Sequence, residues 1–117
     1  MVWETKNKSM VDILNKITES IKNYENGEWQ LDKLIKIRKD LSVNLYFLSV
    51  ENGYAFQRWN SIIYNSKDSV ARATVEANEK VPELRMSRKI IETGRGVNIA
   101  LSSDINALLK EIITIKQ

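Results

Sequence analysis

Basic side chains gather at two places in the 117-residue sequence. One group is Arg85, Arg88, Lys89 and Arg95, with Glu92 as the only opposing charge inside it. At helical spacing Arg85 neighbours Arg88 and Lys89, so these three residues would form a continuous patch, and Glu92 would partly neutralise its far end. Such a patch can contact the phosphates of a nucleic acid, with a salt-dependent contribution to affinity from each contact. The other interpretation is a solvated helix face without a ligand. An earlier basic group contains Lys33, Lys36, Arg38 and Lys39.

Aromatic side chains interleaved with an arginine form a second candidate for nucleic-acid binding. These residues are Tyr54, Arg58, Trp59 and Tyr64. Exposed aromatic rings can stack on the bases of a single strand. Aromatic residues at helical spacing also fit a hydrophobic core, and we favour the core for this group.

Side chains for enzymatic chemistry are scarce. The sequence contains no cysteine and no histidine, which removes thiol chemistry, the commonest metal ligands and the usual acid–base group near neutral pH. The serines therefore lack the usual histidine base. Gly94-Arg95-Gly96 has neither the third glycine nor the preceding strand of a dinucleotide-binding loop. We expect a protein that is not an enzyme, with no metal site and no cofactor.

Composition and length indicate one globular domain covering residues 1–117. Hydrophobic residues make up 43% of the chain and charged residues 28%, as in ordinary globular proteins. The net charge of +3 permits an acidic partner. The sequence has no apolar run of membrane-spanning length and no apolar signal core at its amino terminus. We therefore expect no membrane association and a cytoplasmic location.

Apolar residues recur every three or four positions through most of the chain, which predicts helices. Residues 1–8 form a loose lead-in by this interpretation, Ser9 fits a helix N-cap, and Asn26-Gly27 ends the first helix. No strand-like alternation is present. The expected fold class is all-α: a helical hairpin or three-to-four-helix bundle with long central and C-terminal helices.

Glycines interrupt the two long helices at defined points. Gly53 lies where the apolar register continues on both sides, so we predict a kinked or continuous helix there. Pro82 suits the first turn of the last helix. Gly94 and Gly96 either break that helix near residue 95 or mark the close approach of another backbone. We favour a continuous or kinked helix.

The second helix is apolar on more than one side over residues 41–50. A helix of this kind is usually buried from several directions. It is either the central core helix of one chain or part of a subunit interface. A homo-oligomer would add apolar burial to a small core. The candidate interface residues are Leu41, Leu45, Tyr46, Leu48, Gly94 and Val97.

Several short motifs follow one another over roughly residues 31–113. A leucine-spaced stretch, LDKLIKIRKDLSVNLYFL, is followed by the segment SVARATVEA, by a Pro-Glu-Leu-Arg helix start at Pro82, and by Ile105-x-x-Leu108-Leu109. This order resembles small helical proteins encoded in phage recombination and replication regions, and UvsY-type recombination mediators in particular.

The resemblance implies a ring-like homo-oligomer that binds single-stranded DNA through basic residues and helps to load a recombinase, in the host cytoplasm. It implies DNA contacts at Lys67 and Arg72, and at Arg85, Arg88 and Lys89. The net charge of +3 is modest for that pattern. The alternative function is a phage-encoded protein-binding module, an inhibitor or adaptor, which acts through apolar helix faces at residues 41–50 or 94–100.

Overall fold

Four α-helices and no strand make up the part of the chain that the structure describes. The computed structural model describes residues 2–27 and 29–116, and the side chains of 10–27 and 29–115. The helices are α1 (Val2–Glu25), α2 (Leu31–Asn65), α3 (Val70–Lys80) and α4 (Glu83–Lys116). The prediction of an all-α fold with long central and C-terminal helices is confirmed.

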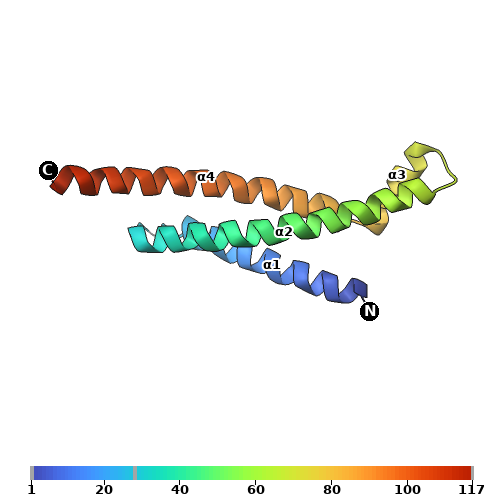
Figure 1. The fold of residues 1–117 in the computed structure, drawn as a ribbon, viewed down its shortest axis with the longest axis horizontal. Coiled ribbons are helices and arrows are strands. Elements are labelled where there is room, and N and C mark those ends of the chain that lie inside the picture. The colour runs from blue at the N-terminus through green and yellow to red at the C-terminus, as the bar shows by residue number, and fades with distance from the viewer. Residues whose placement is uncertain (1, 28, 117) are drawn as a thin grey trace.

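Helix α2 is the central element of an elongated molecule measuring 70 × 28 × 19 Å. It packs against α1, α3 and α4, while α1 and α4 touch each other over a shorter stretch. The chain reverses direction between α1 and α2, and again before α4, so both neighbours run antiparallel to α2 (Figure 1). Short connections between long helices favour this arrangement. The remaining long face of α2, which neither α1 nor α4 covers, is exposed to solvent.

Helix α1 has the predicted end and a different start. Gly27 has a φ of 78°, a left-handed conformation that glycine adopts without steric cost, and it follows the last turn as expected. The helix begins at Val2, so the predicted start at Ser9 is wrong. No glycine or proline interrupts residues 2–8, and serine inside a helix costs only about 0.5 kcal/mol relative to alanine. A good capping residue therefore does not force a helix to start.

Both long helices continue through their glycines, as the apolar register predicted. Helix α2 passes Gly53 and ends at Asn65. Helix α4 passes Gly94 and Gly96 without a break. A Cβ atom on Gly94 would lie 2.5 Å from Cδ2 of Leu45, whereas one on Gly96 would meet no atom of the described residues within 4 Å. Gly94 therefore packs closely against the side chain of Leu45 in α2, whereas the prediction was the close approach of another backbone.

The main hydrophobic core lies where α2 meets α1 and α4. Leu34, Leu41 and Leu48 of α2 are fully buried and recur every seven residues, which places them on one face of a helix. Ile17 from α1 and Leu101 from α4 close the core around them. A smaller cluster of Ala55, Val81 and Leu84 lies towards α3. Helix α2 is thus the central core helix that the sequence suggested.

Candidate interaction surfaces

A stripe of large apolar side chains is exposed on the side of α2 that faces away from the core. The exposed fractions are 46% for Val43, 66% for Tyr46, 48% for Phe47, 39% for Val50 and 44% for Tyr54. Their spacing of three, four and seven residues keeps them on one helix face. We call these five residues the α2 outer face. Tyr46 and Phe47 are in edge-to-face contact, with ring centroids 5.9 Å apart.

The α2 outer face explains why the sequence is apolar on more than one side here. The buried stripe of α2 packs against α1 and α4. The outer stripe is a separate set of apolar residues on the same helix. Contiguous exposed apolar residues of this size mark interaction sites in soluble proteins. Isolated exposed apolar residues would need no explanation, but five at helical spacing form one surface.

The six candidate interface residues occupy different environments. Leu41, Leu45 and Leu48 are buried in the core of their own chain. Gly94 packs against Leu45. Of the six, Tyr46 is the one that is largely exposed, and Val97 is partly buried against the core. Most of the chosen residues therefore lie in the interior of their own chain.

The last turns of α4 carry a second exposed apolar stretch. Ile112, Ile113 and Ile115 are 38%, 57% and 84% exposed. This end of α4 extends beyond the first turn of α2 (Figure 1), so α2 does not cover it. The middle of α2 and the end of α4 are thus two stretches with several exposed apolar side chains each, and other exposed apolar residues, such as Tyr64, Val70 and Ile99, lie outside both.

The basic patch predicted on the last helix lies on the surface of the first turns of α4. Arg85, Arg88, Lys89 and Arg95 are all exposed. None of them forms an ion pair with a residue that the structure describes. The guanidinium carbon of Arg88 lies 5.7 Å from the centroid of the Phe56 ring, within the range of a cation–π contact. The structure therefore provides an exposed cationic surface with an aromatic ring at its edge.

Lys67 and Arg72 lie in a different part of the molecule. Lys67 is exposed in the connection between α2 and α3, and Arg72 is exposed on α3. The backbone N–H of Arg72 donates to Oγ of Ser69, which caps α3. No contact recorded among the described residues joins either side chain to the patch on α4. The basic candidates therefore lie on α4, on α3 and in the connection between α2 and α3.

The predicted group of aromatic residues and Arg58 does not form one surface. Tyr64 is 87% exposed, whereas Trp59 is partly buried and its Nε1 donates to Oδ1 of Asn78 at 2.9 Å. Nη2 of Arg58 donates to Oε1 of Glu83 at 2.9 Å. Arg58 and Trp59 therefore hold α2 to neighbouring helices, consistent with the structural interpretation favoured for them. Phe56, which stacks with Trp59 at 6.0 Å, was not among the predicted residues.

A polar cluster joins the beginning of α4 to α2. Glu83, the first residue of α4, is 4% exposed and pairs with Arg58. Nδ2 of Asn52 donates to Oγ of Ser87 at 2.7 Å and to the backbone carbonyl of Leu84 at 3.2 Å. No local sequence pattern pairs these residues, because the partners are 25 to 35 residues apart. The cluster is only partly satisfied, because Nη1 of Arg58 and Oε2 of Glu83 are buried and have no hydrogen-bond partner among the described residues, and a partly satisfied buried network is costly.

An open groove of about 740 Å³ lies between α1 and α2. Its walls carry charges of both signs, including Lys16, Glu19, Lys36 and Asp40. Val43 and Phe47 of the α2 outer face line this groove, and Phe47 and Val50 line the hollow that follows it along α1. Mixed charges in an open groove do not define the chemistry of a small ligand. The apolar residues of the α2 outer face therefore distinguish this surface more than its charges do.

Comparison with protein families, with curated proteins and with solved structures finds no match to this chain. Among the described residues, no helix has the length and apolar character that crossing a bilayer requires. The information on function therefore comes from the surfaces of the molecule itself.

Proposed function

We propose that this chain is a non-enzymatic helical binding module and that the α2 outer face is its protein-binding surface. The observation that carries the proposal is the exposure of Tyr46 and its four apolar neighbours on a helix whose opposite side already forms the core. An amphipathic helix normally has one apolar stripe, and a second stripe is costly in water unless a partner covers it. This is the module suggested as the alternative function from the sequence.

Paired variants test this function. Tyr46→Glu introduces a charge at the centre of the α2 outer face, and Ile99→Glu introduces the same charge at an exposed apolar position of α4 that is 72% exposed. Both should fold, because both side chains are exposed. A protein partner, or a second copy of the chain, should bind the wild type and Ile99→Glu but not Tyr46→Glu. Equal binding of all three would refute the proposed surface.

Binding of single-stranded nucleic acid is a second candidate function, in the form that the resemblance to recombination mediators implies. The supporting observation is the exposure of Arg85, Arg88, Lys89 and Arg95 without an acidic partner among the described residues. Phosphate contacts release counterions, so affinity should fall steeply as salt rises. Glu92 on the same stretch reduces the net charge of the patch.

Fluorescence anisotropy with a labelled oligonucleotide tests the second candidate at low and at physiological salt. The double variant Arg88→Glu/Lys89→Glu should lose binding. Lys22→Glu/Lys110→Glu changes the net charge equally at exposed positions outside the patch, and it should retain more binding. Absence of binding by the wild type at low salt would eliminate this candidate.

A further inference from the structure

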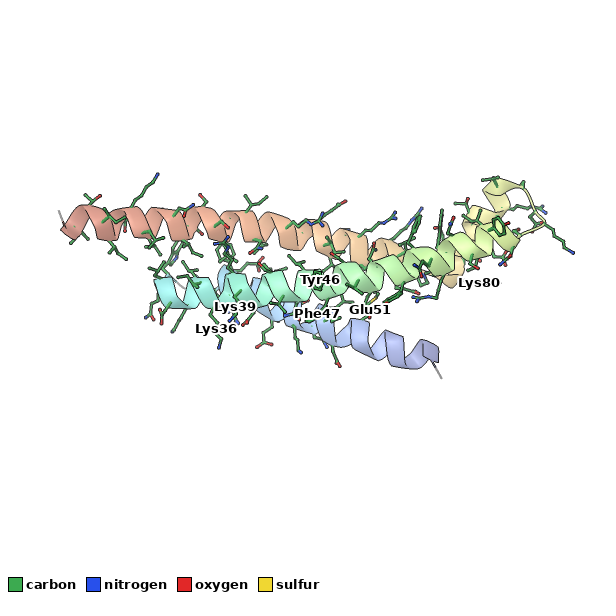
Figure 2. All side chains as sticks on the ribbon, viewed as in Figure 1. Lys36, Lys39, Tyr46, Phe47, Glu51 and Lys80 are labelled. Carbon is green, nitrogen blue, oxygen red and sulfur yellow. The ribbon has the colours of Figure 1, made fainter. Side chains whose placement is uncertain are left out.

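A hollow of about 420 Å³ lies between the carboxyl-terminal part of α2 and the junction of α3 with α4. Arg58 and Glu83, the ion pair of the polar cluster, both line it, together with Tyr54 of the α2 outer face. Lys80 is a further lining residue, and Figure 2 shows it at the end of the molecule where α3 leads into α4, beyond Tyr46 along α2. The α2 outer face therefore continues into a hollow with polar walls.

Two atoms of the ion pair in this hollow have no hydrogen bond. Nη2 of Arg58 donates to Oε1 of Glu83 at 2.9 Å, whereas Nη1 of Arg58 and Oε2 of Glu83 are buried without a partner among the described residues. Nη1 is a donor and the carboxylate oxygen Oε2 is an acceptor. Both belong to the two groups that the 2.9 Å contact joins, so they lie close together. Native proteins rarely leave buried polar atoms unpaired.

We infer that the hollow binds a primary carboxamide, the side-chain group of asparagine and glutamine, which a bound protein inserts beside the ion pair. The carboxamide N–H donates to Oε2 of Glu83, and its carbonyl oxygen accepts from Nη1 of Arg58. The inference rests on the proposed function and specifies the partner, because Tyr54 belongs both to the α2 outer face and to the wall of the hollow. The carboxamide is then a polar anchor at one end of an apolar contact.

The charges around the hollow favour a neutral group over an ion. Arg58 and Lys80 are the cations among the lining residues, and each already has an acidic partner. Arg58 pairs with Glu83, and Nζ of Lys80 donates to Oε1 of Glu76 at 2.7 Å. An anionic or cationic ligand would therefore meet an opposing charge beside every attractive one. A carboxamide offers a donor and an acceptor without a net charge to desolvate.

The positions of the two unpaired atoms distinguish a primary carboxamide from a peptide group. In a primary carboxamide one N–H lies on the same side as the carbonyl oxygen, so one edge of the group offers a donor and an acceptor. A trans peptide group directs its N–H and its C=O to opposite sides. Nη1 of Arg58 and Oε2 of Glu83 flank one ion pair, which matches a single edge. Water also donates and accepts, and it is the competing occupant in the test.

Arg58 provides the access to the two unpaired atoms. Its side chain is 35% exposed, whereas the side chain of Glu83 is 5% exposed. A rotation of the guanidinium therefore opens the ion pair towards the hollow without a change in the core. Ile62 and Val81 also line the hollow, and they supply apolar contacts for the methylene groups that carry a carboxamide.

Titration of the isotope-labelled protein with propionamide, followed by NMR, tests the inference. The backbone signals of Gln57, Ser61 and Lys80 should shift and saturate in the millimolar range, as expected of so small a ligand. Propionate, which only accepts, and N-methylpropionamide, which has a trans peptide-like group, should bind at least about fivefold more weakly. Absence of shifts well above millimolar propionamide, or equal affinity for the three probes, would overturn the inference and leave water beside the ion pair.

Matched variants test the two contacts. Glu83→Gln keeps the shape of the side chain and removes its charge, so it should weaken propionamide binding about tenfold. Glu79→Gln makes the same change at an exposed position of α3 and should leave binding unchanged. Arg58→Lys keeps the charge and removes the second nitrogen of the guanidinium fork, so it should weaken binding even if Glu83→Gln folds poorly by circular dichroism. Unchanged binding in the folded variants would contradict both contacts.

The outcomes separate this inference from the proposed function. If propionamide does not bind but capture of a protein partner still depends on Tyr46, the α2 outer face remains the binding surface and only the carboxamide anchor is excluded. If propionamide binds but substitution of Tyr46 leaves capture unchanged, the hollow is a carboxamide site and the proposed function fails.

Discussion

The hydroxyl of Tyr24 donates a 2.6 Å hydrogen bond to Oδ2 of Asp104, a residue 80 positions further along the chain. This bond links the end of α1 to α4, two helices that otherwise pack mainly on α2. The hydrogen bond to Asp104 raises the pKa of the Tyr24 hydroxyl above its usual value, and desolvation and the charge of Asp104 act in the same direction.

Replacement of Tyr24 by phenylalanine should lower stability by about 1 kcal/mol at neutral pH, the typical contribution of one hydrogen bond. The raised pKa adds a pH dependence, because the unfolded chain loses the phenolic proton at a lower pH than the folded chain. The contribution of the Tyr24–Asp104 hydrogen bond to the free energy of unfolding is fully present below pH of about 10. It declines as pH rises further. Urea unfolding of both proteins between pH 7 and pH 11 measures it. If the difference in unfolding free energy between the two proteins grew at alkaline pH, that result would contradict this account.

Alanine at the two glycines of α4 should have opposite effects. Gly96→Ala should stabilise the protein by up to about 1 kcal/mol, since alanine is the better helix former and a Cβ there meets no atom of the described residues within 4 Å. Gly94→Ala has the same gain in propensity but pushes against Leu45 in the core, and overpacking costs about 1–3 kcal/mol. Chemical denaturation of both variants measures the difference in their free energies of unfolding. Equal stabilisation by both would show that Leu45 moves aside easily.

Loss of Arg58 should cost more than loss of the whole ion pair. Arg58→Met leaves Glu83, whose side chain is 5% exposed, as a buried carboxylate without its partner. The side chain of Arg58 is 35% exposed, so we expect about 2 kcal/mol, below the range for fully buried pairs. The double variant Arg58→Met/Glu83→Leu should recover part of the loss. A double-mutant cycle on unfolding free energies decides the point, and strict additivity would argue against coupling.

Leu48 and Phe47 are neighbours in sequence with opposite roles. Leu48 is fully buried, so Leu48→Ala should destabilise the monomer by about 2–5 kcal/mol. Phe47 is 48% exposed, and Phe47→Ala should change monomer stability by less than about 1 kcal/mol while it weakens the binding of a partner to the α2 outer face. Thermal unfolding of the free chain and binding of the partner that Tyr46→Glu fails to bind separate the two effects. Weakened folding in Phe47→Ala would place this ring in the core instead.

The helices were predictable because apolar spacing records the period of a helix wherever one side is buried. The continuity of α2 through Gly53 and of α4 through Gly94 followed from that register. The start of α1 was not predictable from Ser9, because a capping residue permits a helix start without enforcing it. Local sequence therefore determined the type of each element better than its boundary.

The sequence did not reveal which apolar stripe of α2 faces the core. Leu41 and Tyr46 both belong to stripes of helical period, and only the position of α1 and α4 decides which stripe is covered. The contacts Arg58–Glu83 and Arg88–Phe56 were missed for the same reason. Their partners are distant in sequence, and no local pattern pairs them.

Gly94 also controls how far α4 can slide along α2. A displacement of α4 by one helical turn, about 5.4 Å, would bring Ile90 or Asn98 to the place where Gly94 now faces Leu45. Either side chain would have to displace Leu45, because even a single Cβ atom there would lie 2.5 Å from its Cδ2. The missing side chain thus selects one axial alignment of the two long helices, and the periodic leucine stripe alone would have allowed several.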